Sequence, residues 1–221
     1  MVRNKNIKIV IIDYGMSNMH SVQSACKHLG YNSYVSSNNH EILTADVAIL
    51  PGVGSFGVAI KQLNSLKLTD TIKKFIDTGK LFIGICLGMQ LLFSRSREFG
   101  LHKGLSILNG EVKKFPLYNT DKVKYPIPQV GWNKIKNKKI DWEDTLLSGI
   151  KNEEFMYFVH SYYVKPEDSS IILSETSYAM VDYSSSIKSD NVYGFQFHPE
   201  KSSEFGLIIY KNILNHLKGI E

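Results

Sequence analysis

Cysteine and long apolar runs are both scarce in this sequence. Two cysteines, Cys26 and Cys86, occur among 221 residues, which excludes a disulfide framework and the paired spacing of a structural zinc site. We therefore expect a reducing compartment and assign the chain to the cytoplasm. No stretch reaches the 18 or so apolar residues of a membrane span, and residues 1–8 lack the apolar core of a signal peptide. No membrane contact is predicted.

Concentrated positive charge is lacking too. The formal net charge is +5, but the lysines are scattered, and the densest group is Lys134, Lys136, Lys138 and Lys139. This group contains no interleaved aromatic residues and matches no nucleic-acid or phosphate motif. We interpret it as the solvated face of a hairpin and expect no nucleic-acid partner.

Apolar residues are plentiful enough for a full core, at 43% with 11% aromatic. Strand and helix patterns alternate through the first half, and tight glycine turns separate them. Strands are expected at residues 7–12, 33–35, 47–50 and 81–85, and helices at 18–29, 56–63 and 68–79. Repeated strand–helix units of this kind predict a doubly wound, mostly parallel sheet in an α/β fold.

The pattern changes after Gly110 to β-rich segments separated by polar turns. Strands are expected at residues 111–115, 131–136, 155–159, 171–176 and 192–197, before a closing helix at 205–217. No internal repeat, low-complexity tract or linker interrupts the chain. We therefore expect one domain that spans residues 1–221.

The candidate nucleophile is Cys86 in the pentapeptide GICLG (residues 84–88). It follows a buried strand and precedes a helix signal, as in a strand–turn–helix elbow of the G-x-(nucleophile)-x-G type. Flanking glycines remove the Cβ atoms that would clash at such a turn. The free N–H groups at the start of a helix favour a thiolate. Cys26 lies inside a helical pattern without an elbow, and we interpret it as a structural residue.

The candidate base is His198, in the sequence FHPE (residues 197–200). A cysteine hydrolase needs a histidine to take the thiol proton and return it to the leaving amine. It also needs an acceptor that orients the imidazole, and Glu200 can reach back around Pro199. The remaining histidines are interpreted as structural, with His160 the exception to watch. His198 and Glu200 alone are too few ligands for a metal site, so neither metal nor cofactor is expected.

These residues resemble those of a known enzyme family. The sequences GICLGMQ (84–90) and FHPE resemble the class I, triad-type glutamine amidotransferases. More narrowly, the chain resembles the glutaminase subunits of imidazole glycerol phosphate synthases. The segments that carry this narrower resemblance are IDYGMSN (12–18), LPGVGSF (50–56), GWN (131–133), YFVHSY (157–162) and HPEKS (198–202). They occur in order along almost the whole chain. Met89 and the Lys201-Ser202 pair also favour this branch over those serving anthranilate, guanylate or carbamoyl phosphate synthesis.

The resemblance implies a flavodoxin-like, three-layer fold with a β-rich second half. It also implies a partner, a (β/α)₈-barrel cyclase that forms a heterodimer with this chain. Glutamine hydrolysed here would supply ammonia through the barrel. The ammonia would react with a phosphoribulosyl-formimino aminoimidazole carboxamide ribotide to give imidazole glycerol phosphate and an aminoimidazole carboxamide ribotide in histidine biosynthesis.

The resemblance also assigns roles to individual residues. Cys86, His198 and Glu200 match the catalytic triad. Gly52 and Val53 match an oxyanion loop whose amide is thought to rotate when the partner binds, and the Leu87 amide matches the second oxyanion donor. The other assignments are Gln90, Glu98, Ser161 and Tyr162 for glutamine binding, and Trp132, Tyr157 and Lys201 for the rim that faces the partner. The glycines Gly52 and Gly54 are expected to leave this loop free to change its peptide orientation.

Two segments depart from the family pattern. Gln129 stands where the family usually has histidine, and residues 177–180 lack the glycine expected after Tyr178. We place both near the partner face or in a peripheral hairpin, so they bear on the partner rather than on catalysis. A paralogous branch that supplies ammonia for amino or amidino groups on surface sugars therefore stays open as an alternative.

Two further functions compete with that of a glutaminase. A cysteine peptidase or γ-glutamyl hydrolase would use the same elbow and histidine, but Gln90 and the PGVG loop (51–54) argue against it. A non-catalytic binding protein would be expected to lose at least one member of the triad. Cys86, His198 and Glu200 are all present.

Overall fold

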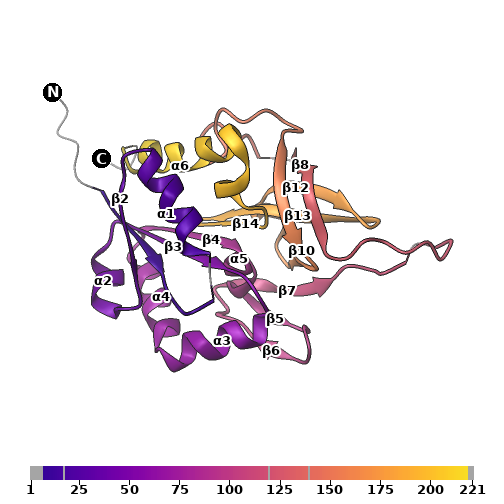
Figure 1. The fold of residues 1–221 in the computed structure, drawn as a ribbon, viewed down its shortest axis with the longest axis horizontal. Coiled ribbons are helices and arrows are strands. Elements are labelled where there is room, and N and C mark those ends of the chain that lie inside the picture. Colours follow the sequence, from indigo (N-terminus) through magenta and orange to yellow (C-terminus); the bar gives the residue numbers. More distant parts are fainter. Residues whose placement is uncertain (1–6, 17, 119, 139, 219–221) are drawn as a thin grey trace.

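An eight-stranded sheet forms the centre of the structure, a computed structural model that describes residues 7–16, 18–118, 120–138 and 140–218 (Figure 1). Its first five strands are parallel and run in the order β2-β1-β3-β4-β14, the order of flavodoxin-like sheets. Their bounds are β1 (Lys8–Ile12), β2 (Asn32–Ser36), β3 (Val47–Gly52), β4 (Leu81–Cys86) and β14 (Val192–Phe195). The expected doubly wound, mostly parallel sheet is confirmed.

Helices cover both faces of this sheet, as Figure 1 shows. The buried strand β1 divides its side chains between two cores: Ile9 and Ile11 pack with the helices of one face, and Val10 and Ile12 with those of the other. The first face carries α1 (Met19–His28) and α6 (Ser203–Lys218); the second carries α2 (Asn39–Thr44), α3 (Phe56–Ser65) and α4 (Leu68–Asp77). This arrangement is the expected three-layer fold.

The second half of the chain is β-rich, also as expected. Three antiparallel strands, β13, β12 and β9, extend the large sheet beyond β14, so both halves of the chain share it. A hairpin of β8 and β10 and a four-stranded sheet in the order β11-β7-β5-β6 stand beside it. Their bounds are β5 (Phe93–Ser96), β6 (His102–Lys103), β7 (Leu108–Lys114), β8 (Gln129–Lys134), β9 (Lys136–Asn137), β10 (Phe155–His160), β11 (Tyr162–Pro166), β12 (Ile172–Tyr178) and β13 (Val181–Ser189).

Three parallel strands bring distant segments to one edge of the sheet. The carboxyl ends of β3, β4 and β14 lie side by side, with Gly52 in register with Cys86 and Phe195 in register with Ile85. The elbow at Cys86 leads into the short helix α5 (Leu87–Leu91), and the segment after β14 leads through the 3₁₀ turn η2 (Pro199–Lys201) into α6. Ligands of doubly wound sheets bind at such carboxyl ends.

The lysine group of the second half lies on the surface. Lys134 and Lys136 share the carboxylate of Glu153, at 3.0 and 3.9 Å, and Lys138 pairs with Glu175. Two residues from the sequence patterns, Lys139 and Ser17 of the segment 12–18, lie outside the described residues. The exposed pairs fit a solvated face.

Among the helices of the described residues, none combines the length and apolarity needed to cross a bilayer.

Candidate active site

Cys86 occupies a strained turn, as the elbow pattern predicted. Its backbone has φ 55° and ψ −111°, a region that side-chain-bearing residues rarely adopt. A Cβ at Gly84 would lie 2.8 Å from the Gly88 carbonyl oxygen, and one at Gly88 only 1.8 Å from that of Leu50. Both flanking positions therefore require glycine, because the turn is packed directly against its own backbone and against β3.

His198 and Glu200 form a buried pair. Nδ1 of His198 lies 2.7 Å from Oε1 of Glu200, and their side chains are 4% and 2% exposed. Burial alone would lower the pKa of His198, but the adjacent Cys86 sulfur and the Glu200 carboxylate outweigh it and raise that pKa to about 10. Nε2 of His198 makes no hydrogen bond within the described part of the chain. The pair thus has one nitrogen oriented by the carboxylate and the other available for chemistry.

One pocket of about 240 Å³ contains Cys86 and His198 together. Elements from both halves of the chain form it, and it includes all four residues expected to bind glutamine. Its lining residues are Val53, Gly54, Cys86, Leu87, Gln90, Glu98, Pro128, Val159, His160, Ser161, Tyr162 and His198. The structure therefore brings the expected site residues of five separate segments into one cavity.

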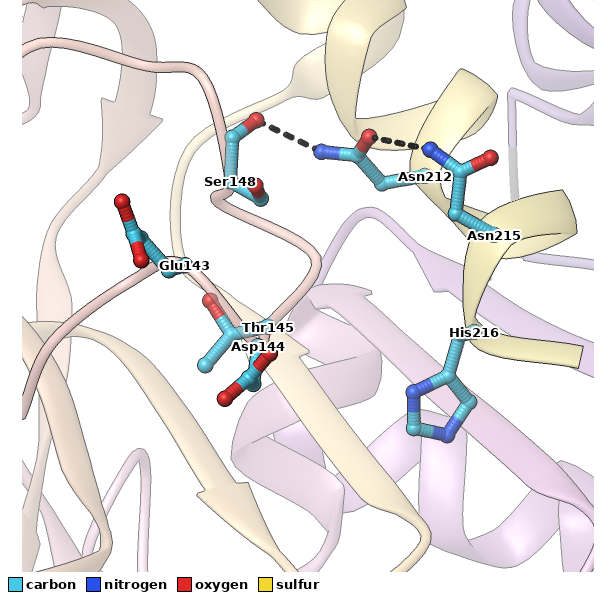
Figure 2. A pocket seen from close by; sticks show the side chains of 7 residues that line it. All are labelled: Glu143, Asp144, Thr145, Ser148, Asn212, Asn215 and His216. Atoms are coloured by element: carbon cyan, nitrogen blue, oxygen red, sulfur yellow. Dashed lines mark hydrogen bonds between the residues drawn. The ribbon is translucent and has the colours of Figure 1, made fainter. Parts of the chain in front are cut away.

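A second pocket, of about 380 Å³, is larger but contains no nucleophile. Figure 2 shows it between the loop of residues 143–148 and the last turns of α6, where Asn212 bonds to the Ser148 carbonyl and His216 faces the opening. Carboxylates from Glu143 and Asp144 line it, and neither Cys86 nor His198 does. The larger cavity is therefore not the active site. The presence of Cys86 and His198 together places the active site in the smaller pocket.

The Val53 amide points away from an oxyanion. Its N–H donates to the Met16 carbonyl oxygen at 3.0 Å, so it is not free to stabilise negative charge in the pocket. The Leu87 amide, in contrast, begins α5, where the first N–H groups have no acceptor within the helix. One of the two expected oxyanion donors is in place in this conformation.

Gly52 and Gly54 have different surroundings in this loop. A Cβ at Gly52 would lie 2.4 Å from the Tyr14 hydroxyl and 2.9 Å from the Leu87 Cβ, so glycine there allows close packing. Gly54 has φ +92°, which glycine adopts readily. The Val53 N–H belongs to the Gly52–Val53 peptide, so its rotation changes ψ of Gly52 and φ of Val53.

Gln90 is held by two acceptors on the pocket wall. Its Nε2 donates to the Tyr162 carbonyl and to Oε1 of Gln196, each at 2.9 Å. Gln196 in turn places its Nε2 3.7 Å from the Cys86 sulfur. The sequence did not single out Gln196, although it lies two residues before His198 in the same motif.

Glu98 closes another side of the pocket. Its Oε2 accepts the backbone N–H of Phe56 at the start of α3, which fixes the carboxylate. Burial, the largest influence, raises the pKa of Glu98, and the Phe56 amide and neighbouring positive charges oppose it.

His160 proves to be a structural histidine beside the pocket. Both ring nitrogens are occupied, Nδ1 by the Tyr162 carbonyl at 2.8 Å and Nε2 by the Tyr183 hydroxyl at 3.2 Å. Burial lowers its pKa to about 4, with the Tyr162 carbonyl opposing this and His198 adding to it. With both ring nitrogens in contact with groups outside the cavity chemistry, His160 supports the pocket wall.

Gln129 is buried on β8, the strand that also carries Trp132. It is 3% exposed, and its Oε1 accepts the hydroxyl of Tyr183, which also contacts His160. The residue that departs from the family pattern therefore lies in a buried network directly behind the pocket. The other departure does lie in a hairpin turn, where Ala179 and Met180 adopt φ 48° and 60° between β12 and β13.

The three residues expected to face a partner lie together on the surface, although they are distant in sequence. Trp132 and Tyr157 are opposite each other on β8 and β10, with ring centroids 6.0 Å apart, and the Lys201 amine lies 6.0 Å from the Tyr157 centroid. Trp132 is 52% exposed. An exposed aromatic pair with an adjacent cation is typical of a protein interface.

Cys26 lies in a setting unlike that of Cys86. It is fully buried within α1, away from the pocket, and burial raises its pKa to about 12 despite the opposing influence of Ser33. A neutral buried thiol is chemically inert, in agreement with its interpretation as structural.

Comparison with known proteins identifies close sequence relatives. The family model described as glutamine amidotransferase class-I matches residues 10–215. Three curated relatives share the description imidazole glycerol phosphate synthase subunit HisH. That of Aquifex aeolicus is 49% identical over 93% of this chain and 95% of its own length. That of Caldanaerobacter subterraneus is 45% identical over 95% and 98%, and that of Chlorobium luteolum 44% identical over 92% and 98%.

Solved structures share the fold at much lower sequence identity. The PurLQS structure from Thermotoga maritima superposes with a TM-score of 0.68 at 19% identity, covering 96% of this chain and 99% of that one. The glutaminase domain of CTPS from Trypanosoma brucei gives 0.63 at 14% identity, covering 95% and 94%. At these identities the likeness establishes the three-layer fold.

Proposed function

The chain belongs to the glutamine amidotransferase class-I family, and from that premise we propose that its whole length forms one domain, the glutaminase subunit of an imidazole glycerol phosphate synthase. The observation that carries the activity is the pocket in which the strained Cys86 meets the His198–Glu200 pair. The synthase assignment rests on the HisH relatives, which match more than nine-tenths of the chain at 44–49% identity. These relatives disfavour the surface-sugar alternative.

The proposed reaction is hydrolysis of the glutamine side-chain amide. The Cys86 thiolate attacks the carboxamide carbon, and the oxygen gains the negative charge. Nε2 of His198 then donates a proton to the departing nitrogen, which leaves as ammonia, and a glutamyl thioester remains on Cys86. His198 next takes a proton from water, whose oxygen displaces the sulfur and releases glutamate. Glu200 keeps the imidazole oriented in both steps.

Glutamine is proposed to lie along the pocket between Glu98 and Cys86. The buried Glu98 carboxylate suits the ammonium group of an amino acid. Gln90, whose Nε2 is already occupied, offers its Oε1, and Ser161 and Tyr162 line the opposite wall. These residues recognise the substrate, and the triad cleaves it.

The ammonia acceptor is proposed to lie in a (β/α)₈-barrel cyclase that binds the face formed by Trp132, Tyr157 and Lys201. In this scheme ammonia enters the barrel and is consumed in forming imidazole glycerol phosphate. Both cysteines are free, which fits a reducing compartment such as the cytoplasm.

Reconstitution tests this function. The purified chain, a HisF-type cyclase and the ribotide acceptor should together convert glutamine to glutamate and form imidazole glycerol phosphate in equal amounts. Glutamate without imidazole glycerol phosphate would point to another acceptor. Hydrolysis of γ-glutamyl peptides by the chain alone would favour an independent hydrolase.

The base and its orienting group should differ in their effects. His198→Asn removes the group that transfers protons, so we expect a loss on the order of 10⁴-fold or more in kcat. Glu200→Gln keeps a hydrogen-bonding oxygen beside Nδ1 and should cost less, because the imidazole remains partly oriented. Glutamate release by the reconstituted complex measures both. Equal losses would instead assign Glu200 a direct chemical role, and His40→Asn on α2 provides the control.

A further inference from the structure

Three unpaired polar atoms gather around the triad. Among the described residues, six buried side-chain atoms have no hydrogen-bond partner, including Nε2 of His198, Oε2 of Glu200 and the hydroxyl of Tyr210. The catalytic cycle accounts for Nε2, which transfers the proton. It does not account for Oε2 of Glu200 or for Tyr210. Buried polar atoms are almost always paired, so these two require an explanation.

Helix α6 packs against the turn that carries Glu200. A Cβ at Gly206 would lie 1.9 Å from the Pro199 carbonyl oxygen, and the Gly206 N–H donates to the Ser202 carbonyl at 2.9 Å. Glycine at this position therefore lets the helix approach η2 at backbone distance. The contact fixes α6 relative to His198 and Glu200, which flank Pro199.

Tyr210 lies one helical turn after Gly206, on the same face of α6. Long side chains in a helix lean toward its N-terminus, and for Tyr210 this is the direction of the Gly206 turn that contacts η2. The residue is 2% exposed, and its carbonyl accepts the Tyr31 hydroxyl at 2.9 Å, which anchors this part of the helix.

Electrostatics agree with this placement. Burial is the largest cause of the raised pKa of Tyr210, and the negative charge of Glu200 adds to it, followed by that of Cys26. The hydroxyl is thus neutral, keeps its proton and lies within electrostatic range of the carboxylate. For Tyr193, another fully buried tyrosine, the negative charge of Glu200 is not among the causes of the raised pKa.

We propose that Tyr210 is a positioning residue for the triad, its hydroxyl donating to a water molecule that in turn donates to Oε2 of Glu200. This role rests on the proposed glutaminase activity. The carboxylate is then held at both oxygens, by His198 at Oε1 and, through this water molecule, by Tyr210 at Oε2. Held in this way, it keeps the imidazole in the orientation that the reaction needs.

The position of Glu200 separates this role from substrate binding. Glu200 lines a groove between α1 and α6, whereas His198 and Cys86 line the glutamine pocket. Tyr210 contributes to neither lining. Loss of its hydroxyl should therefore change the chemical step and leave glutamine affinity unaltered.

The test is Tyr210→Phe in the reconstituted complex, with Tyr193→Phe as the matched control. We expect kcat to fall about tenfold, the usual scale for losing one hydrogen bond to a charged group, with KM for glutamine unchanged. The pH profile of kcat should also change, because the imidazole that Glu200 orients transfers the protons of the reaction. Tyr193→Phe should change none of these quantities.

A second measurement does not depend on turnover. The NMR resonance of the proton between His198 Nδ1 and Glu200 should shift in Tyr210→Phe and stay in place in Tyr193→Phe. An unchanged resonance and pH profile in Tyr210→Phe, or equal changes in both variants, would overturn the proposal. An inactive wild-type complex in which this resonance still responds to Tyr210→Phe would instead refute the glutaminase function and leave the positioning role standing.

Discussion

Cys86→Ala is expected to abolish glutamine hydrolysis, with a loss on the order of 10⁴-fold or more in kcat. Without the sulfur no thioester can form, and the pocket contains no other nucleophile at the elbow. Alanine fits the space of the thiol, so the fold and partner binding should be kept. Glutamate release by the reconstituted complex measures the activity. Circular dichroism measures whether the fold is kept, and gel filtration measures partner binding.

Cys86→Ser and Cys26→Ser complete this experiment. Serine at position 86 should be almost as inactive as alanine, because the site is arranged for a thiolate and not for an alkoxide. Cys26→Ser changes the other cysteine, which is buried in α1 away from the pocket, and should keep most of the activity. Substantial glutamate release by Cys86→Ala would contradict the triad assignment.

The isolated chain is expected to be a poor glutaminase that its partner activates well above tenfold. The Val53 amide, one of two expected oxyanion donors, bonds to the Met16 carbonyl in the structure. Removing one oxyanion donor typically costs about 10²–10³-fold in rate. Rotation of the Gly52–Val53 peptide would complete the site, and a docked barrel with bound acceptor can favour that orientation.

Glutamate release by the chain alone, then with the cyclase and then with its acceptor ligand, measures this activation. Trp132→Ala, on the face proposed for the partner, should raise the cyclase concentration needed without changing the rate of the isolated chain. Full activity of the isolated chain, unaltered by any barrel protein, would contradict the gating by Val53. It would also favour the independent hydrolase.

Local signals in the sequence were sufficient for the core of the fold. The β-branched run that ends at Ile12 and the apolar strand before Cys86 are buried on both faces, so their composition alone marks them as central strands. The elbow at Cys86 could also be predicted from the sequence, because the strained turn requires glycine at 84 and 88. Short elements with weak patterns, such as α2 and the two-residue strands β6 and β9, gave no such signal.

The parts of the site that the sequence did not reveal depend on contacts between distant segments. Gln129 bonds to Tyr183, 54 residues away, within a buried network. The Gln196 contact with Cys86 spans 110 residues. No local pattern encodes such pairings, because they arise only when strands that are distant in sequence become neighbours.

The pairing of β14 with β4 also determines when in folding the active site can form. Cys86 and His198 are 198 − 86 = 112 residues apart, and β14 must insert beside β4 after all the intervening β-strands have been made. Contacts of such high sequence separation form slowly, because loop closure must come first. On the ribosome the nucleophile emerges long before its base, so nascent and truncated chains carry an ordinary cysteine. The triad is therefore assembled only when β14 has paired with β4.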